Sequence, residues 1–170
     1  MRSIRKAALF AALALTLLGG KAYADCYSTY AANADFESGT ASWTKTQGYF
    51  GNAEYPSGSG NHWGLLRGAT GYTSEISQSF TTTEGGGYYA FFLDTYLSVN
   101  PSSCTATLTW ISGGGTTTFT DTIDYGNVNH VFIIPAGHDS ATAKIAINCT
   151  GLGRYVQVDN ACIFFVGALP

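Results

Sequence analysis

Asn33-Ala34-Asp35-Phe36-Glu37-Ser38-Gly39-Thr40, with Trp43 just after it, is the stretch on which the interpretation of this 170-residue sequence depends. A second acidic stretch, Tyr155-Val156-Gln157-Val158-Asp159-Asn160, stands near the other end of the chain. Polar and apolar residues alternate in this second stretch, which is the pattern of a strand with one buried face. These two are called the opening stretch and the closing stretch.

Between these stretches, apolar residues alternate with polar ones, and clusters of glycine and serine interrupt the pattern. Short β-strands separated by turns have this pattern, and no segment of the domain has the period of a helix. We expect strands at 74–82, 88–99, 104–111, 116–124, 128–134, 141–149 and 154–166. Short strands at this spacing predict a single all-β sandwich domain over residues 25–170.

Residues 1–24 have the features of a secretory signal peptide. Its basic residues are Arg2, Arg5 and Lys6. An apolar run at 7–18 follows, and Ala22-Tyr23-Ala24 is a small-x-small cleavage site. The apolar run is too short for a comfortable membrane span. We therefore expect a secreted mature chain that begins at Asp25 and has no membrane span.

Signal cleavage would leave an acidic chain with a formal charge of −7, from four basic against eleven acidic residues. The remaining basic residues, scattered singly, are Lys45, Arg67, Lys144 and Arg154. Such a charge disfavours nucleic acid and anionic membrane surfaces as partners. The abundance of glycine, threonine, serine and tyrosine suits a secreted β protein that meets neutral, hydroxyl-rich ligands.

Four cysteines fit two disulfide bonds in an oxidising compartment, and three pairings are possible. Cys104 and Cys149 both fall on the apolar face of their expected strands, so both side chains point inward. Strand parity therefore favours a Cys104–Cys149 bond, and Cys26–Cys162 would then tie the first strand to the last. The same parity turns Asn148 outward, within an Asn-x-Thr sequon that is an N-glycosylation acceptor if the source glycosylates.

The segment 88–97 is apolar on both faces. One face carries Tyr89, Phe91 and Leu93, and the other carries Tyr88, Phe92 and Tyr96, with Ala90 and Asp94 between them. Such a strand is either buried on both faces or presents an aromatic stripe to a ligand. The sequence leaves both possibilities open.

Sugar binding needs flat aromatic faces together with a few hydrogen-bonding side chains. Several aromatic residues fall in an early third that is rich in loop signals: Tyr49, Phe50, Tyr55, Trp63 and Tyr72. Trp63 is the first candidate, because it follows a Gly/Ser turn and stands among polar residues. Tyr96, Phe92 and Asp94 on the sheet face come second, and Tyr55 completes the predicted ligand site. For each aromatic residue the alternative is that it fills the core, which we expect for Trp43 and Trp110.

No catalytic motif is present, since G-x-S-x-G, H-E-x-x-H and a phosphate-binding loop are all missing from the sequence. His130 lies in a strand pattern and is expected to be structural. Carboxylates for glycoside hydrolysis could come from Asp94, Asp121 or Asp124, but nothing separates these from turn and surface acids. We predict no catalytic residue and no enzymatic activity.

Taken in order, the motifs resemble carbohydrate-binding modules of families four, nine and twenty-two. The motifs are the opening and closing stretches, Ile76-Ser77-Gln78-Ser79-Phe80-Thr81, Gly87-Tyr88-Tyr89-Ala90-Phe91-Phe92 and Ile134-Pro135-Ala136-Gly137. The resemblance implies a galactose-binding-like jelly roll. It also implies a structural calcium ion with Glu37 and Asp159 as side-chain ligands, whereas these acids could instead cap turns.

The resemblance further implies a monomeric, non-catalytic module that recognises a neutral poly- or oligosaccharide. The alternative is a structural or adhesive extracellular scaffold without a sugar ligand, because this fold supports many functions. A small hydrolase that uses Asp94 is a third, weaker hypothesis.

Overall fold

The computed structural model describes residues 30–81, 88–98, 103–113, 115–134, 140–151 and 153–167. The strands in this part of the chain are β1 (Thr44–Gln47), β2 (Phe50–Glu54), β3 (His62–Gly68), β4 (Thr73–Thr81), β5 (Tyr88–Leu97), β6 (Cys104–Ser112), β7 (Gly115–Ile123), β8 (Gly126–Ile134), β9 (Ser140–Cys149) and β10 (Arg154–Gly167). The predicted signal peptide lies outside the described residues. Within them, no helix is long and apolar enough to cross a membrane.

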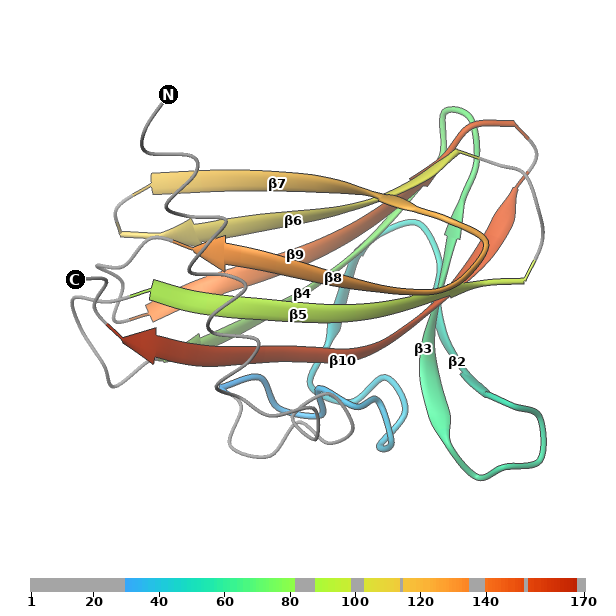
Figure 1. The fold of residues 1–170 in the computed structure, drawn as a ribbon, viewed down its shortest axis with the longest axis horizontal. Helices are drawn as coiled ribbons and strands as arrows, with labels where there is room; N and C mark the ends of the chain where they lie inside the picture. Colours follow the sequence, from blue (N-terminus) through green and yellow to red (C-terminus); the bar gives the residue numbers. More distant parts are fainter. Residues whose placement is uncertain are drawn as a thin grey trace.

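The strands form two five-stranded antiparallel sheets (Figure 1). The first sheet has the order β1-β4-β9-β6-β7, and the second has the order β2-β3-β10-β5-β8. Apart from the consecutive pairs β2–β3 and β6–β7, neighbouring strands are not consecutive in the chain, which crosses repeatedly from one layer to the other. The all-β sandwich and the seven strands expected from alternation, β4 to β10, are confirmed.

The first three strands lie where the sequence pattern indicated loops, so that prediction was wrong. β3 pairs with both β2 and β10 and is a central strand of the second sheet. Glycines at two of its inward positions interrupt the alternation of apolar and polar residues. Gly64 is needed because a larger side chain would not fit at this position. A Cβ atom at Gly64 would lie 2.9 Å from a methyl carbon of Val158 and 3.0 Å from the ring of Phe36.

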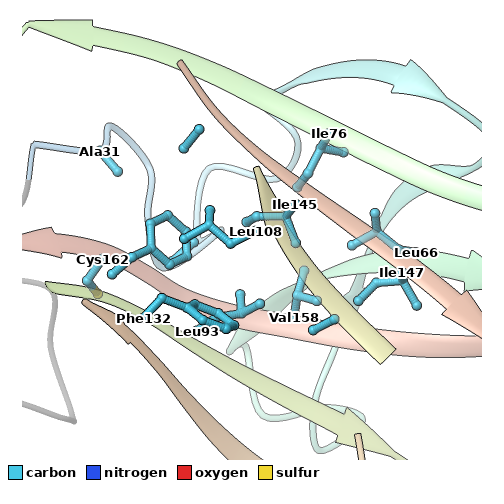
Figure 2. Close-up of a cluster of buried hydrophobic side chains, with 14 of the residues drawn as sticks. Ala31, Leu66, Ile76, Leu93, Leu108, Phe132, Ile145, Ile147, Val158 and Cys162 are labelled. Atoms are coloured by element: carbon cyan, nitrogen blue, oxygen red, sulfur yellow. The ribbon is translucent and has the colours of Figure 1, made fainter. Parts of the chain in front are cut away.

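The core lies between the inward faces of the two sheets. Figure 2 shows side chains from both sheets pointing toward each other, with Leu108 and Ile145 of the first sheet near Val158 of the second. Trp43 and Trp110 are 5% and 1% exposed, which confirms that both are core residues. On β6, the buried and partly exposed side chains alternate as parity predicts.

The predicted Cys104–Cys149 disulfide is present, and the two residues are directly opposite each other on β6 and β9. Cys162 is also disulfide-bonded, and its expected partner, Cys26, lies outside the described residues. Asn148 is exposed on the outer side of β9, as parity predicts.

The opening stretch is a series of turns. Segment 30–43, blue in Figure 1, runs beside β10 and joins the two sheets along one side of the sandwich. The Ala34 carbonyl accepts a hydrogen bond from the Ala161 amide of β10. In the first sheet, the side-chain amide of Gln78 on β4 binds the backbone of Ala32. Its oxygen accepts a hydrogen bond of 2.7 Å from the Ala32 amide, and its nitrogen donates one of 2.8 Å to the Ala32 carbonyl. The same nitrogen donates to the Ser42 carbonyl.

A polar chain also connects the two sheets, between their edge strands β7 and β8. Asp121 of β7 accepts a hydrogen bond of 2.9 Å from Nδ1 of His130 on β8. Nε2 of His130 is 2.9 Å from the hydroxyl of Thr95 on β5. His130 is 1% exposed and Thr95 is fully buried, so this carboxylate–imidazole–hydroxyl chain is structural, as expected for His130.

Replacing Gln78 by Ala should lower the free energy of unfolding by roughly 3 kcal/mol. The substitution leaves the Ala32 amide and the carbonyls of Ala32 and Ser42 without their partner in a partly buried position, and each unsatisfied buried group costs about 1–3 kcal/mol. Urea denaturation of Q78A and of the control Ser79→Ala, an exposed neighbour on the same strand, measures the effect. Equal stability of the two variants would contradict the role given to Gln78.

Replacing Asp121 by Asn should change the acid dependence of stability. The hydrogen bond from His130 lowers the pKa of Asp121 below its ordinary value of 3.8. A carboxyl whose pKa is lower in the folded state stabilises the protein above pH 3.8, and this contribution is lost as the pH falls through the folded-state pKa. The free energy of unfolding should therefore fall less steeply from pH 6 to pH 2 in D121N than in the native protein. Asp124→Asn, the control, should follow the native protein.

Candidate functional site

The predicted ligand residues all lie on the outer face of the second sheet, the face that points away from the core. On β5, the side chains of Phe92, Asp94 and Tyr96 are half-buried and alternate with fully buried neighbours. Cross-strand register places Asp94 opposite Asp159 of β10. Trp63 of β3 points to the same face, because its neighbour Gly64 points inward.

An aromatic group forms around Tyr55, which follows β2 in the loop that leads to β3. The Tyr55 ring lies 4.2 Å from the Tyr96 ring, centroid to centroid, and its edge contacts Trp63 at 5.5 Å. The loop is held by a hydrogen bond of 2.9 Å from the Tyr55 amide to the Asn61 carbonyl. A hydrogen bond with Tyr96 raises the pKa of the Tyr55 hydroxyl. Tyr55 therefore contacts two of the other predicted ligand residues, Trp63 and Tyr96.

Trp63 is less exposed than a ring available for sugar stacking would be. It is only 9% exposed, since the Tyr55 ring covers part of it. Its indole Nε1 is buried and has no hydrogen-bond partner among the described residues, and the same holds for Oε1 of Gln157 on β10. A buried polar group without a partner costs about 1–3 kcal/mol. The outer face therefore holds one buried donor and one buried acceptor without a partner in the described part of the chain.

Amide and carboxyl groups make a polar patch beside the aromatic group. Asp94 accepts a hydrogen bond of 2.7 Å from the side-chain amide of Asn129 on one oxygen, and one of 2.8 Å from Asn160 on the other. Asn160 has a positive φ of 48° and lies where β10 bulges against β5. The bulge turns the Asn160 side chain toward Asp94 instead of continuing the strand alternation.

The two carboxyl groups of this patch hold their protons more tightly than usual. Burial is the main cause for Asp94, whose pKa is raised. Burial also raises the pKa of Asp159 to about 8, and the nearby charges of Asp94, Asp35 and Glu37 add to this effect. At neutral pH Asp159 is therefore mostly a neutral acid that can donate a hydrogen bond. The patch thus offers donors and acceptors in close proximity.

The predicted calcium ligands each accept hydrogen bonds from the protein backbone. Glu37 accepts a hydrogen bond of 2.9 Å from the His62 amide, and its other oxygen is 3.6 Å from Nδ1 of His62. Asp159 accepts a hydrogen bond from the Asn160 amide. Among the described residues, no group of three or more His, Cys, Asp or Glu side chains is arranged to hold a metal ion. Calcium binding by Glu37 and Asp159 stays a prediction.

Phe92 stands apart from the other ligand candidates. Its ring packs against Phe164 of β10 with centroids 5.6 Å apart, in an edge-to-face arrangement. The outer face of β5 is thus neither fully buried nor an open aromatic stripe, which answers the ambiguity of segment 88–97. Sequence reasoning missed Asn129, Asn160 and Gln157. Only Gln157 carried a usable signal, since it alternates with two buried valines on β10.

No protein-family model matches this sequence, and no curated protein matches it either. Solved structures do match. A structure of TmCBM61 in complex with β-1,4-galactotriose superimposes with a TM-score of 0.63 at 15% identity, covering 81% of this chain and 98% of that one. The C-terminal family 22 carbohydrate-binding module of Clostridium thermocellum Xyn10B gives a TM-score of 0.54 at 18% identity, covering 85% and 99%.

A third similar structure belongs to a larger protein. The enzymatically active domain of tailspike protein 4 from bacteriophage CBA120 gives a TM-score of 0.62 at 13% identity, covering 84% of this chain but only 22% of the tailspike chain. At these identities the likeness concerns the fold. The chain has the β-sandwich fold of carbohydrate-binding modules.

Proposed function

We propose that this protein is a secreted, non-catalytic carbohydrate-binding module that holds a largely neutral poly- or oligosaccharide on the outer face of its second sheet. The observation that carries the proposal is the contact of Tyr55, Trp63 and Tyr96 beside the polar patch of Asp94 and Asn160. The fold shared with carbohydrate-binding modules supports it.

The chemistry of this face suits a sugar. A pyranose ring has an apolar C–H side that stacks on an aromatic ring, and hydroxyl groups at its rim that need both donors and acceptors. The Tyr55 and Tyr96 rings supply the first requirement. The amides of Asn129 and Asn160, together with the carboxyl group of Asp94, supply the second. The acidic character of the chain favours a glycan of low negative charge.

A non-catalytic role fits the environment of the carboxyl groups. Both oxygens of Asp94 already accept hydrogen bonds from asparagine side chains. The hydroxyl of the Asp121–His130–Thr95 chain belongs to a fully buried side chain, out of reach of a substrate. These contacts favour binding without hydrolysis.

The alternative, a structural or adhesive scaffold, has one observation in its favour. Tyr55 packs against Trp63 and leaves it 9% exposed, as a purely structural aromatic cluster would. Under this alternative the outer face has no sugar affinity to lose. An experiment that measures polysaccharide binding therefore separates the two functions.

We also propose a structural calcium ion that involves Glu37 and Asp159. Supporting this, the charges of Asp35, Glu37 and Asp94 all act on Asp159, so several carboxyl groups share one region. A divalent cation there would reduce their mutual repulsion, but binding would require Asp159 to lose its proton and Glu37 to leave His62.

Replacing Tyr96 by Ala should weaken polysaccharide binding at least tenfold, which corresponds to about 1.4 kcal/mol. The variant removes the ring that lies directly against Tyr55. Affinity electrophoresis in gels containing neutral polysaccharides measures the effect for the native protein, Y96A and Trp63→Ala. Ile111→Ala, an exposed residue on the first sheet, is the matched control and should migrate like the native protein.

Circular dichroism must show that each variant is folded. If no polysaccharide retards the folded native protein, carbohydrate binding is wrong and the scaffold alternative gains support. Retardation that Y96A and W63A leave unchanged would instead place the ligand elsewhere on the molecule.

If the calcium proposal holds, chelation should lower the melting temperature, and adding calcium should restore it. Binding to the folded state alone stabilises that state by mass action. Calorimetry of the native protein and of Asp159→Asn, with and without chelator, tests this. An identical melting temperature of the native protein under both conditions would rule the ion out.

A further inference from the structure

A tyrosine–arginine cluster, made of Tyr49, Arg67, Tyr72 and Tyr155, lies on the same outer face, toward the end of β3 near the turn into β4. The guanidinium carbon of Arg67 is 5.6 Å from the centre of the Tyr72 ring and 5.9 Å from that of Tyr155. The Tyr49 ring meets Tyr155 edge to face at 5.4 Å. Arg67 and Tyr155 are opposite each other on β3 and β10, so they share a face.

The cluster is open to solvent, unlike the group around Trp63. Tyr49, Tyr72 and Tyr155 are 39%, 37% and 50% exposed. They are three of the six large apolar side chains that the described part of the chain exposes. Exposed aromatic side chains gathered in one patch mark a binding surface more often than single exposed residues do.

Two glycines make room for the cluster. A Cβ atom at Gly51 would lie 2.6 Å from the hydroxyl oxygen of Tyr49. A Cβ atom at Gly153 would lie 2.7 Å from Nη2 of Arg67. Neither glycine has a positive φ, so the backbone conformation does not require glycine at these positions. Their lack of side chains therefore allows the tyrosine ring and the guanidinium to lie close against the backbone.

Arg67 has no carboxylate partner among the described residues, whose salt bridges within 4.0 Å involve His62, His130 and Lys144. A guanidinium presents a planar set of donors that matches a carboxylate, and flanking aromatic rings hold it in place. The cluster thus combines rings for stacking with an unpaired positive charge.

We propose that the tyrosine–arginine cluster is a subsite for a sugar residue that carries a carboxylate, a uronic acid within an otherwise neutral glycan. This subsite rests on the proposed function and extends it. Trp63 and Arg67 are four residues apart on β3, which corresponds to roughly 13 Å along a strand. One short glycan can span that distance. The excess of acidic residues disfavours dense polyanions, so an occasional carboxylate is the ligand that suits one exposed arginine.

Nuclear magnetic resonance titration with sugar pairs tests the subsite. The probes are methyl β-glucuronoside against methyl β-glucoside, and methyl α-galacturonoside against methyl α-galactoside. At least one uronoside should shift the Arg67 Nε–H signal and bind several-fold more tightly than its neutral counterpart. Raising the salt concentration should reduce the difference, because the interaction is between exposed charges.

Arg67→Gln should abolish the preference for the uronoside, and Arg67→Lys, which keeps the charge but not the planar set of donors, should retain only part of it. Lys144→Gln is the matched control, since it removes one positive charge from the other sheet and should leave the preference unchanged. Equal affinity for charged and neutral sugars, the absence of any shift at Arg67, or an unchanged preference in R67Q would overturn the subsite.

The two proposals can fail separately. Retardation by a neutral polysaccharide that depends on Tyr96, without a uronoside preference at Arg67, would leave the proposed function standing and remove the subsite. The opposite result is also possible: no neutral polysaccharide retards the protein, but Arg67 gives a preference for the uronoside. That result would support the subsite and contradict the proposed function.

Discussion

The attachment of segment 30–43 to both sheets is the constraint on which the rest of the structure depends. Gln78 binds the backbone of this segment to the first sheet, and the Ala34 carbonyl binds it to β10 of the second. Phe36 then fills the space that Gly64 leaves open and stacks on Trp43 at 5.6 Å. The segment therefore closes one side of the sandwich where the sheets would otherwise leave an apolar opening. It also sets the position of β3, and through β3 the side chains of Trp63 and Arg67 on the outer face.

Alternation predicted the later part of the fold because most strands from β4 to β10 bury one face, and a period of two is visible in their residues. The edge strand β7 is exposed along most of its length. The same parity predicted the Cys104–Cys149 bond, since two inward cysteines on neighbouring strands have few other partners. It failed for β2 and β3, where glycines are selected for the space they leave to Phe36 and Tyr49 and carry no hydrophobic signal. Alternation carries no information on the opening stretch, whose turns are stabilised by Gln78, a residue 46 positions away from Ala32.

The candidate site was predictable in part for the same reason. Phe92, Asp94 and Tyr96 share a face by parity, and the structure adds Trp63 and Tyr55 to that face. The burial of Trp63 was not predictable, because it depends on how the loop after β2 places the Tyr55 ring. Asn160 reaches Asp94 only because β10 bulges, and a bulge leaves no clear pattern in the sequence. The tyrosine–arginine cluster depends on the pairing of β3 with β10, which joins residues almost ninety positions apart.

The distribution of the tryptophans gives the molecule a built-in optical reporter. The chain has three of them, and Trp43 and Trp110 are held in the core, where no surface event alters their surroundings directly. Trp63 alone lies on the outer face, in contact with a tyrosine ring that belongs to a loop. A molecule that displaces that ring changes the polarity around one indole and leaves the other two unchanged. The emission spectrum of the unlabelled protein therefore distinguishes an event at this face from a loosening of the whole fold, which would alter all three.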